Sequence, residues 1–561
     1  MENSKDIEDL TDLIGHYGKY QKLLLGLVIY VGIFSAFNNL NLPFLAPKID
    51  YWCSRLPEYL NTSIEEWKNF SIPIEIRNGK HVYSKCEIYE EAYRGHYSID
   101  SPSVPCSSWE YDHSNYKSTI TEQWGLVCEN SWMISFAGSI YFVGFLVTAF
   151  VSGQLSDRFG RRPVVLSCII INSVFGITCT ISPYYWMFAT SRFLLSFGRA
   201  GLFLSWLILV VEIMGPKHRT RVSTSDKIGW ATGQIILPGI AWLVKDWYYI
   251  QLASTLPVIL LIFLWKYIPE SPRWLLSHGK FHEADIIIRK IMTTNGKKVD
   301  ELDVIIRKLA FKIKMEDKDK TAKNITFIDL FKNIQICKLT LLQYFIWMVT
   351  VFAFYGLSFN ADDTGGSVYL FYVLCGLMDY PSALLMQLLV VRIGRRYPLL
   401  VFLLISGICC IVASAIPDDM TWLRIVLAVS SKFCLSTALS ILYIFSSEIY
   451  PTPVRNVGLG SCSMMGRIGA IIAPFMKQAS EMVHWALPFG IFGIMSIAAG
   501  LLALLLPETK NTHLTDCFVI NYTTKTDDSS LGNVLPGKET VHFEPLIQVD
   551  KPTLNETQRE E

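Results

Sequence analysis

The sequence predicts an all-α membrane protein with twelve transmembrane helices, arranged as two parallel six-helix pseudo-repeats, and with one large disulfide-bearing extracellular loop. Three observations carry this prediction. Hydrophobic residues make up 51% of the 561 residues, and charged residues make up only 18%. The apolar residues gather in runs of about 17 to 25, the length that spans a bilayer as a helix. Sequence motifs also recur between the two halves of the chain at nearly constant spacing.

The composition excludes several other classes of protein. The chain holds 50 Lys and Arg against 49 Asp and Glu, which leaves no basic excess for binding nucleic acid. Its apolar content excludes a disordered or collagen-like chain. No phosphate-binding loop, His-Glu-x-x-His zinc motif or Gly-x-Ser-x-Gly nucleophile turn occurs. We therefore expect neither an enzyme nor a cofactor or metal site.

The first apolar run covers residues 23–46. It follows an acidic stretch and is longer than the core of a signal peptide, so we expect it to be the first transmembrane helix. The eleven further runs are 132–151, 164–181, 186–211, 228–244, 247–267, 339–359, 368–391, 399–416, 422–443, 457–476 and 485–506.

Basic residues in alternate short loops predict the orientation. The loops around 157–162, 217–227 and 392–396 are rich in Lys and Arg, which favours the cytosolic side. With an even number of spans, both termini are then cytosolic in a multi-pass protein of the plasma membrane. The predicted order is a cytosolic N-terminus (1–22), an N-terminal half (23–267), a cytosolic helical loop (268–338), a C-terminal half (339–506) and a disordered cytosolic tail (507–561).

The segment 47–131 is predicted to be extracellular. It carries 8 Lys and Arg against 13 Asp and Glu, and two glycosylation sequons at Asn61 and Asn69. It also holds an even number of cysteines, which predicts two disulfides with three pairings open. These cysteines are Cys53, Cys86, Cys106 and Cys128.

An internal repeat is the strongest feature of the sequence. The segment 153–162 (GQLSDRFGRR) recurs as 387–396 (QLLVVRIGRR), a shift of 234 residues. Glu212 with Arg219 recurs as Glu448 with Arg455, and the Pro-Glu pair at 269–270 recurs at 507–508. Two halves that rock about a central site provide alternating access to that site from the two sides of a membrane.

The repeated acids and arginines are predicted to form a gate at the cytosolic mouth of each half. Opposite charges in a partly dry interface can hold one conformation and release it in the other. The alternative is that they are ordinary positive-inside anchors. The second copy has Val391 where the first has Asp157. The predicted gate consists of Asp157, Arg158, Arg161, Arg162, Glu212, Arg219, Arg395, Arg396, Glu448 and Arg455.

Segment 153–162 resembles the loop signature of the major facilitator superfamily, and segment 192–198 (RFLLSFG) resembles its fourth-helix arginine motif. Within that superfamily, 269–276 (PESPRWLL), 447–456 (SEIYPTPVRN) and the cysteine-bearing loop ending in 123–128 (QWGLVC) resemble the organic cation, anion and carnitine transporters of solute carrier family 22. The resemblance implies the major facilitator fold. Sugar porters share part of these motifs but usually have a short first loop, so a sugar transporter is the alternative.

Charged residues in the middle of predicted spans point to a substrate site, because a bilayer makes them costly unless they face a polar cavity. Arg467 matches a position where, by resemblance, the anion and carnitine branches carry arginine and the cation branch carries aspartate. Aromatic and amide side chains complete a broad pocket. The predicted substrate-binding residues are Arg467, Arg199, Asp379, Tyr355, Phe354, Trp230, Gln234 and Asn38.

These residues predict transport of small organic ions. An organic anion or a carnitine-like zwitterion is preferred, and an organic cation stays open because Asp379 is able to hold an ammonium group. A non-transporting membrane receptor is a further alternative. The expected partners are the substrate and the lipid bilayer, with a coupling ion or counter-substrate left open, and no nucleic acid.

Overall fold

The computed structural model describes residues 9–510 apart from 78–79, 91, 93–101, 298–301, 322–325 and 452–453. The predicted disordered tail therefore lies almost entirely outside the described residues.

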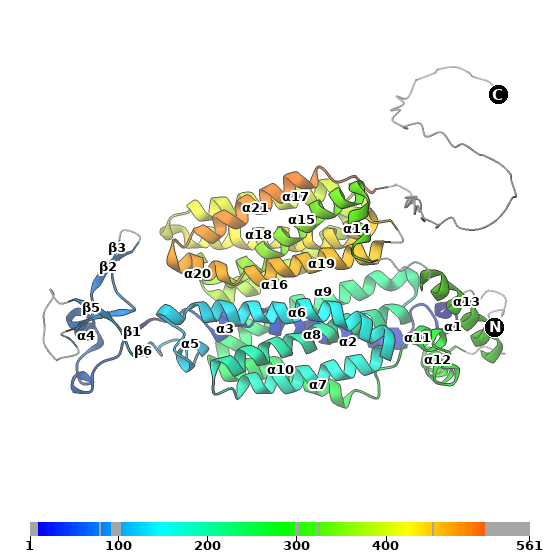
Figure 1. The fold of residues 1–561 in the computed structure, drawn as a ribbon, viewed down its shortest axis with the longest axis horizontal. Coiled ribbons are helices and arrows are strands. Elements are labelled where there is room, and N and C mark those ends of the chain that lie inside the picture. The colour runs from blue at the N-terminus through cyan, green and yellow to red at the C-terminus, as the bar shows by residue number, and fades with distance from the viewer. Residues whose placement is uncertain are drawn as a thin grey trace, which may run out of the picture. The chain divides into compact units, whose positions relative to one another are not determined.

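Most of the described chain is helical (Figure 1). The long helices of the first half are α2 (Lys19–Leu40), α6 (Trp132–Phe159), α7 (Arg161–Thr180), α8 (Tyr185–Ile213), α9 (Arg219–Val244) and α10 (Trp247–Phe263). Those of the second half are α15 (Ile334–Phe359), α16 (Val368–Arg392), α17 (Arg396–Ala415), α18 (Thr421–Ile449), α19 (Arg455–Ile472) and α21 (Leu487–Ala503).

Each predicted apolar run coincides with one of these helices, although several helices extend beyond the run. Among the described residues, nine helices are long and apolar enough to cross a membrane, and two apolar helices, α10 and α21, are shorter. The helix α9 does not reach that apolarity although it has 26 residues. A count of twelve spans is therefore not established by length and composition.

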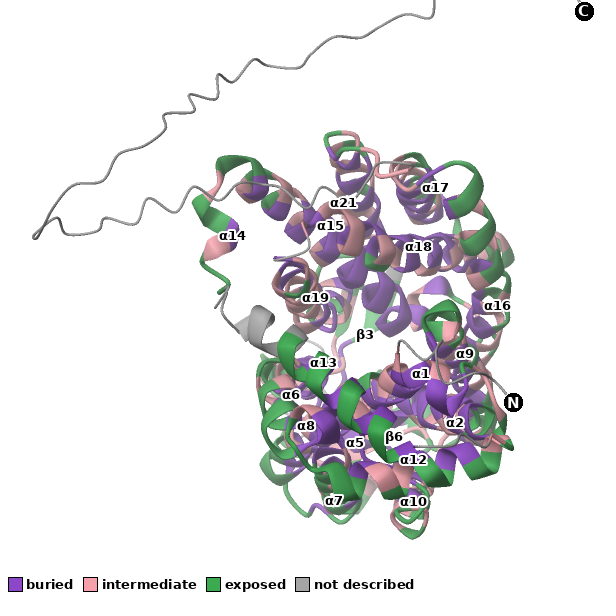
Figure 2. Cartoon of the chain, turned by 90° about the vertical axis from the view of Figure 1, so that its right-hand side faces the viewer, coloured by how far each residue is buried: buried purple, intermediate pink, exposed green. Residues whose placement is uncertain are grey.

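The helices pack into two groups that follow the predicted halves. In the first, α7 and α6 pack on α8, and α2 packs on α9; in the second, α17 packs on α18 and α21, and α15 packs on α19. Contacts between the halves run mainly through α9 with α16 and through α6 with α19. Figure 2 views the chain along the helices and shows buried residues mainly in the interior and exposed residues mainly on the outer surface. The main apolar core contains residues of both halves.

The helical domain has two structurally different ends. The loop end carries the segment between α3 (Leu42–Leu45) and α6, and the arginine end carries the turns at 157–162 and 392–396. Short helices pack on the first half at the arginine end, where their apolar faces join α2, α7 and α8 in a second core. They are α1 (Leu10–Ile14), α11 (Pro272–Ser277), α12 (Phe281–Asn295) and α13 (Leu302–Thr321). The remaining short helices are α14 (Asp329–Lys332) before α15 and α20 (Phe475–Met482) after α19.

The segment at the loop end is a small β-rich unit with its own core around Trp52 and Trp67. Its three antiparallel pairs are β1 (Tyr51–Cys53) with β6 (Trp109–Tyr111), β2 (Ile74–Arg77) with β3 (Lys80–Tyr83), and β4 (Glu87–Tyr89) with β5 (Ser103–Pro105). Helix α4 (Ile64–Ser71) begins with a capping box in which the Ser63 hydroxyl accepts a hydrogen bond from the Glu66 N–H. Helix α5 (Ile120–Gln123) leads back toward the membrane domain.

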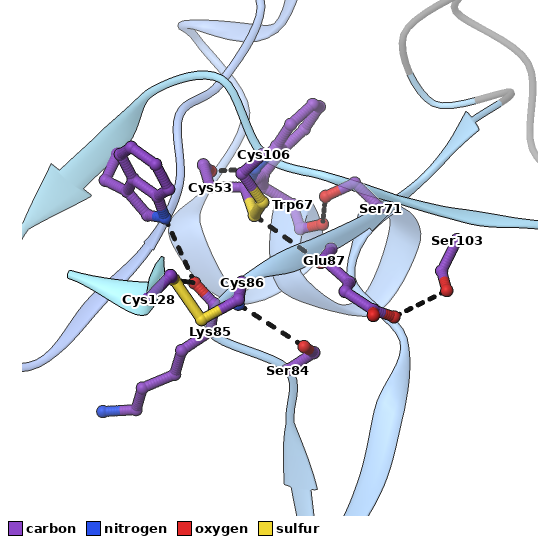
Figure 3. The surroundings of a disulfide bond; sticks show 11 residues. Cys53, Trp67, Ser71, Ser84, Lys85, Cys86, Glu87, Ser103, Cys106 and Cys128 are labelled. Carbon is purple, nitrogen blue, oxygen red and sulfur yellow. Dashed lines mark hydrogen bonds between the residues drawn. A yellow bond between two sulfur atoms is a disulfide. The ribbon is translucent and has the colours of Figure 1, made fainter. Parts of the chain in front are cut away.

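Two disulfides close this unit. Within its described part, Cys53 is bonded to Cys106 and Cys86 to Cys128, which is one of the three pairings that the sequence left open. Figure 3 shows both bonds beside Trp67, whose indole N–H donates to the Cys53 carbonyl at 3.0 Å. A unit this small has little apolar core, so cross-links of this kind stabilise it by restricting the unfolded chain. Asn61 and Asn69 are both exposed on it.

Candidate substrate cavity

A cavity with an empty volume of about 870 Å³ lies between the two halves. Its wall combines aromatic rings, hydroxyl groups and charged side chains, the mixture expected of a site for a small organic ion. Helix α9 of the first half contributes to the wall, and α15, α16, α18 and α19 of the second half supply the rest. The lining residues are Asp226, Lys227, Trp230, Trp347, Val351, Phe354, Tyr355, Asp379, Ser382, Ser436, Leu439, Ser440, Tyr443, Ser463 and Arg467.

Five of the predicted substrate-binding residues line this cavity: Trp230, Phe354, Tyr355, Asp379 and Arg467. The other three do not. Asn38 and Arg199 line a smaller cavity inside the first half, between α2, α7, α8 and α10. Gln234 is buried in α9. Sequence spacing placed the three charged residues Arg199, Asp379 and Arg467 near mid-depth of the membrane, but depth does not determine which way a side chain points around the helix axis.

The charged groups of the wall come from both halves. Four of the described lining residues are charged: Asp226 and Lys227 lie on α9, Asp379 on α16 and Arg467 on α19. The Lys227 ammonium donates a hydrogen bond to the Ser440 hydroxyl on α18, which links the halves. The Asp379 carboxylate lies near Ser436 of α18, and its Oδ2 atom is buried without a hydrogen-bond partner among the described residues. The formal charges of these four side chains sum to zero.

Arg467 lies at the boundary between the halves. Its guanidinium carbon is 3.9 Å from the centroid of the Phe145 ring on α6, and the guanidinium lies near the Tyr355 hydroxyl of α15. The guanidinium of Arg199 also lies over Phe145, at 5.5 Å. One aromatic ring therefore contacts a cation from each half. An arginine guanidinium can bind a carboxylate through two parallel hydrogen bonds.

Three charged residues near the cavity were missed by the sequence analysis. Asp226 and Lys227 follow a basic loop closely, so Lys227 was counted among its cytosolic charges. Lys432 lies mid-way along α18, is almost fully buried, and donates hydrogen bonds to the Phe354 carbonyl and the Ser358 hydroxyl. A charge in the middle of an apolar run was the signal used for Arg199, and the same signal was present for Lys432.

The repeated motifs form matching ion pairs at the arginine end. The Arg161 guanidinium lies 3.0 Å from the Glu212 carboxylate and 2.9 Å from Asp157, and the Arg395 guanidinium lies 2.7 Å from Glu448. Each of these pairs joins residues of one half, not residues of opposite halves. Val391 has no carboxylate, so the second half lacks the counterpart of the Asp157 contact.

The other predicted gating residues do not pair with the repeated acids in the described interactions. Arg158 lies over Phe159, Arg162 donates to the Trp265 carbonyl and Arg396 to the Leu504 carbonyl. Arg455 contacts the Tyr450 carbonyl, and Arg219 is exposed at the start of α9. Among the predicted gating residues, Glu212 thus pairs with Arg161, and Glu448 pairs with Arg395.

The third repeated motif explains how the turns before α7 and α17 are built. The Glu270 carboxylate accepts hydrogen bonds from the N–H groups of Arg161 and Arg162, the first residues of α7. Glu508 accepts the equivalent bonds from Arg395 and Arg396 at α17. A carboxylate at a helix N-terminus satisfies unpaired N–H groups and complements the helix dipole. Burial alone would raise the pKa of Glu508, but these N–H donors hold it below its ordinary value.

The profile of the family described as "Sugar (and other) transporter" matches residues 91–518. The chain is 33% identical to an organic cation transporter protein of Drosophila melanogaster, over 90% of this chain and 92% of that protein. It is 31% identical to organic cation/carnitine transporter 2 of Homo sapiens, over 91% of this chain and 93% of that protein. It is 32% identical to solute carrier family 22 member 4 of Mus musculus, over 90% and 92%.

Solved structures show the same fold. A partially occluded inward open conformation of the xylose transporter XylE from E. coli aligns with a TM-score of 0.60 and 15% identity, covering 88% of this chain and all of that one. XylE bound to 6-bromo-6-deoxy-D-glucose, described as a major facilitator superfamily protein, aligns with a TM-score of 0.56 and 17% identity over 89% of this chain. The related proteins are transporters and not enzymes. The chain therefore belongs to the major facilitator superfamily and, within it, to the organic cation, anion and carnitine transporters of solute carrier family 22.

Proposed function

We propose that this protein transports small organic ions that carry both a carboxylate and an ammonium group, by alternating access of the cavity between its halves. The observation that carries this proposal is the balanced charge of the cavity wall. Asp226, Lys227, Asp379 and Arg467 provide two acids and two bases around one space. A zwitterion leaves that balance unchanged, whereas a simple cation or anion adds an uncompensated charge at membrane depth.

The aromatic residues of the wall support the same class of substrate. Five aromatic residues line the cavity: Trp230, Trp347, Phe354, Tyr355 and Tyr443. Ring faces attract alkylated ammonium groups and exclude water from them. The names of the curated relatives, organic cation and carnitine transporters, agree with a cavity of this kind.

Contacts between the halves support alternating access. Near the loop end, the hydroxyls of Ser135 and Ser139 on α6 donate to the carbonyls of Pro474 and Ile471 at 3.0 Å and 2.5 Å. Phe44 also stacks on Tyr369 of α16 there. These contacts hold the halves together near the loop end.

The orientation completes the proposal. The arginine end and both termini face the cytosol, and the disulfide-bearing loop faces the outside of the plasma membrane, as the basic loops favour. Glycans on Asn61 and Asn69 are part of this proposal, because both side chains are exposed on that loop.

Uptake measured in cells that express the protein tests the proposed substrate class. We expect carnitine to accumulate faster than benzoate, tetraethylammonium or glucose, each supplied with and without external sodium. Faster uptake of glucose than of any ion would replace this function with sugar transport. Saturable binding without uptake of any of the four would indicate a receptor. The sodium arm shows whether a coupling ion takes part.

The ion pairs at the arginine end are proposed to gate the cavity by locking the helices within each half. Glu212→Gln removes the partly buried partner of Arg161, whereas the Asp157 side chain is 76% exposed and screened by water. We expect Glu212→Gln to lower the maximal uptake rate severalfold with the half-saturating concentration within twofold of wild type. Asp157→Asn should lower the rate less. Asp303→Asn, which removes an exposed ion pair far from the cavity, is the control. A larger effect of Asp157→Asn than of Glu212→Gln would contradict this assignment.

A further inference from the structure

Lys227 occupies a position that the proposed function does not by itself explain. It lies eight residues after the first residue of α9 and lines the substrate cavity. Its ammonium group donates a hydrogen bond to Ser440 of α18, so a side chain of the first half reaches the wall formed by the second half. A primary ammonium on a flexible stem is a compact charge that can change partners when another cation arrives.

The charges around Lys227 alternate in sign. Lys227 is attracted by Asp379 of α16 and by Asp226, its neighbour on α9. Asp379 in turn is attracted by Lys432 of α18, and Asp226 by Arg199 of α8. Lys227 therefore lies in the electrostatic field of one acid from each half, while the hydrogen bond that its ammonium donates goes to Ser440. Its charge neutralises these carboxylates when no substrate is bound.

The arrival of a substrate changes the sum of the formal charges in the cavity. With Lys227 present, the lining charges sum to zero, so a simple cation that approaches Asp379 brings the sum to plus one, an uncompensated charge in a region of low dielectric. A zwitterion brings a carboxylate with its ammonium group, and that carboxylate supplies the partner which Lys227 and Arg467 then need. Without Lys227, the lining charges would sum to minus one, which favours a cation.

We propose that Lys227 is a tethered counter-cation for Asp379 across the cavity, that the ammonium group of the substrate takes over this role, and that Lys227 thereby selects zwitterions against simple cations. This inference rests on the proposed function and names the residue that determines its specificity. Arg467 binds the carboxylate in either case. Lys227 determines whether a substrate without a carboxylate is accepted.

The test compares uptake of tetraethylammonium with uptake of carnitine, each normalised to the amount of protein at the cell surface. In Lys227→Gln we expect the ratio of tetraethylammonium to carnitine uptake to rise at least tenfold. Lys227→Arg keeps the charge, so its ratio should stay within threefold of wild type. Lys217→Gln is the matched control, because it removes a lysine that is exposed just before the same helix.

Lys227→Met, which keeps the apolar stem, provides a second neutral variant in which the same rise is expected. Both variants are also purified, and the shift in melting temperature caused by each probe is measured, so that binding is observed independently of transport. A ratio within twofold of wild type in both neutral variants would overturn the role of Lys227. An equal rise in Lys217→Gln would overturn it as well. If the wild-type protein takes up carnitine and these ratios do not change, only this inference fails; if the wild-type protein takes up neither probe, the proposed function itself fails.

Discussion

Uptake of carnitine is expected to fall at least tenfold when Arg467 is replaced by aspartate, while the amount of protein at the cell surface stays within twofold of wild type. Arg467 lines the cavity, and its guanidinium carbon lies 3.9 Å from the centroid of the Phe145 ring. The substitution exchanges the proposed carboxylate anchor for a group that repels a carboxylate. A tenfold loss corresponds to about 1.4 kcal/mol, which is within the range of a single charge-assisted hydrogen bond.

The same substitution is expected to have the opposite effect on a simple cation. Arg467→Asp should raise uptake of tetraethylammonium relative to carnitine, because the sum of the lining charges changes from zero to minus two. Arg467→Lys preserves the charge but loses the planar pair of donors, so an intermediate rate is expected. Unchanged carnitine uptake in Arg467→Asp at normal surface amount would remove this residue from the site.

Gly160→Ala is expected to destabilise the folded protein by about 1–3 kcal/mol through backbone strain alone and to reduce its amount at the cell surface severalfold. Gly160 has φ +101° and ψ 162°, a conformation that residues with a Cβ rarely adopt. A Cβ there would also lie 2.5 Å from a carboxylate oxygen of Glu270. That carboxylate would have to leave the N–H groups of Arg161 and Arg162, so the start of α7 would lose its cap.

The repeat provides an internal replicate and a control for this prediction. Gly394→Ala should act in the same direction, since Gly394 has φ +121° and a Cβ there would lie 2.9 Å from Glu508. Gly153→Ala is the control, because it lies inside α6 and its Cβ would meet nothing within 4 Å. The melting temperature of purified protein and surface labelling measure the effect. Equal stability of the Gly160→Ala and Gly153→Ala variants would refute the proposed role of this turn.

The helices were largely predictable because a bilayer demands long uninterrupted apolar segments. Helix α9 is an exception to this agreement. Helix α9 was predicted from residue 228 onward, yet it begins at Arg219 and its first two turns are polar. Asp226 and Lys227 belong to this extension. A hydropathy pattern ends a span where charges appear, whereas the folded helix continues because those charges face a cavity and not lipid.

The candidate site was predictable only in part. Arg467 and Asp379 were found because a charge at mid-depth is costly unless it faces a polar space, and both line the cavity. Arg199 satisfied the same criterion but faces a smaller cavity inside the first half. Lys227 was assigned to a cytosolic loop. Depth along a helix follows from sequence position, but the direction of a side chain depends on how each helix is rotated within the bundle.

The sequence by itself determined the membrane class, the location of the apolar spans, the duplication into two halves and the family. These follow from composition, from run length and from motifs whose spacing is a property of the chain. Three features became known from the folded structure alone. They are the disulfide pairing and the pairing of the repeated arginines with acids of their own half. The third is the cavity lined by Asp226, Lys227, Asp379 and Arg467. These contacts join residues far apart in the chain, and their distances are set by the packing of one helix against another, which no local pattern encodes.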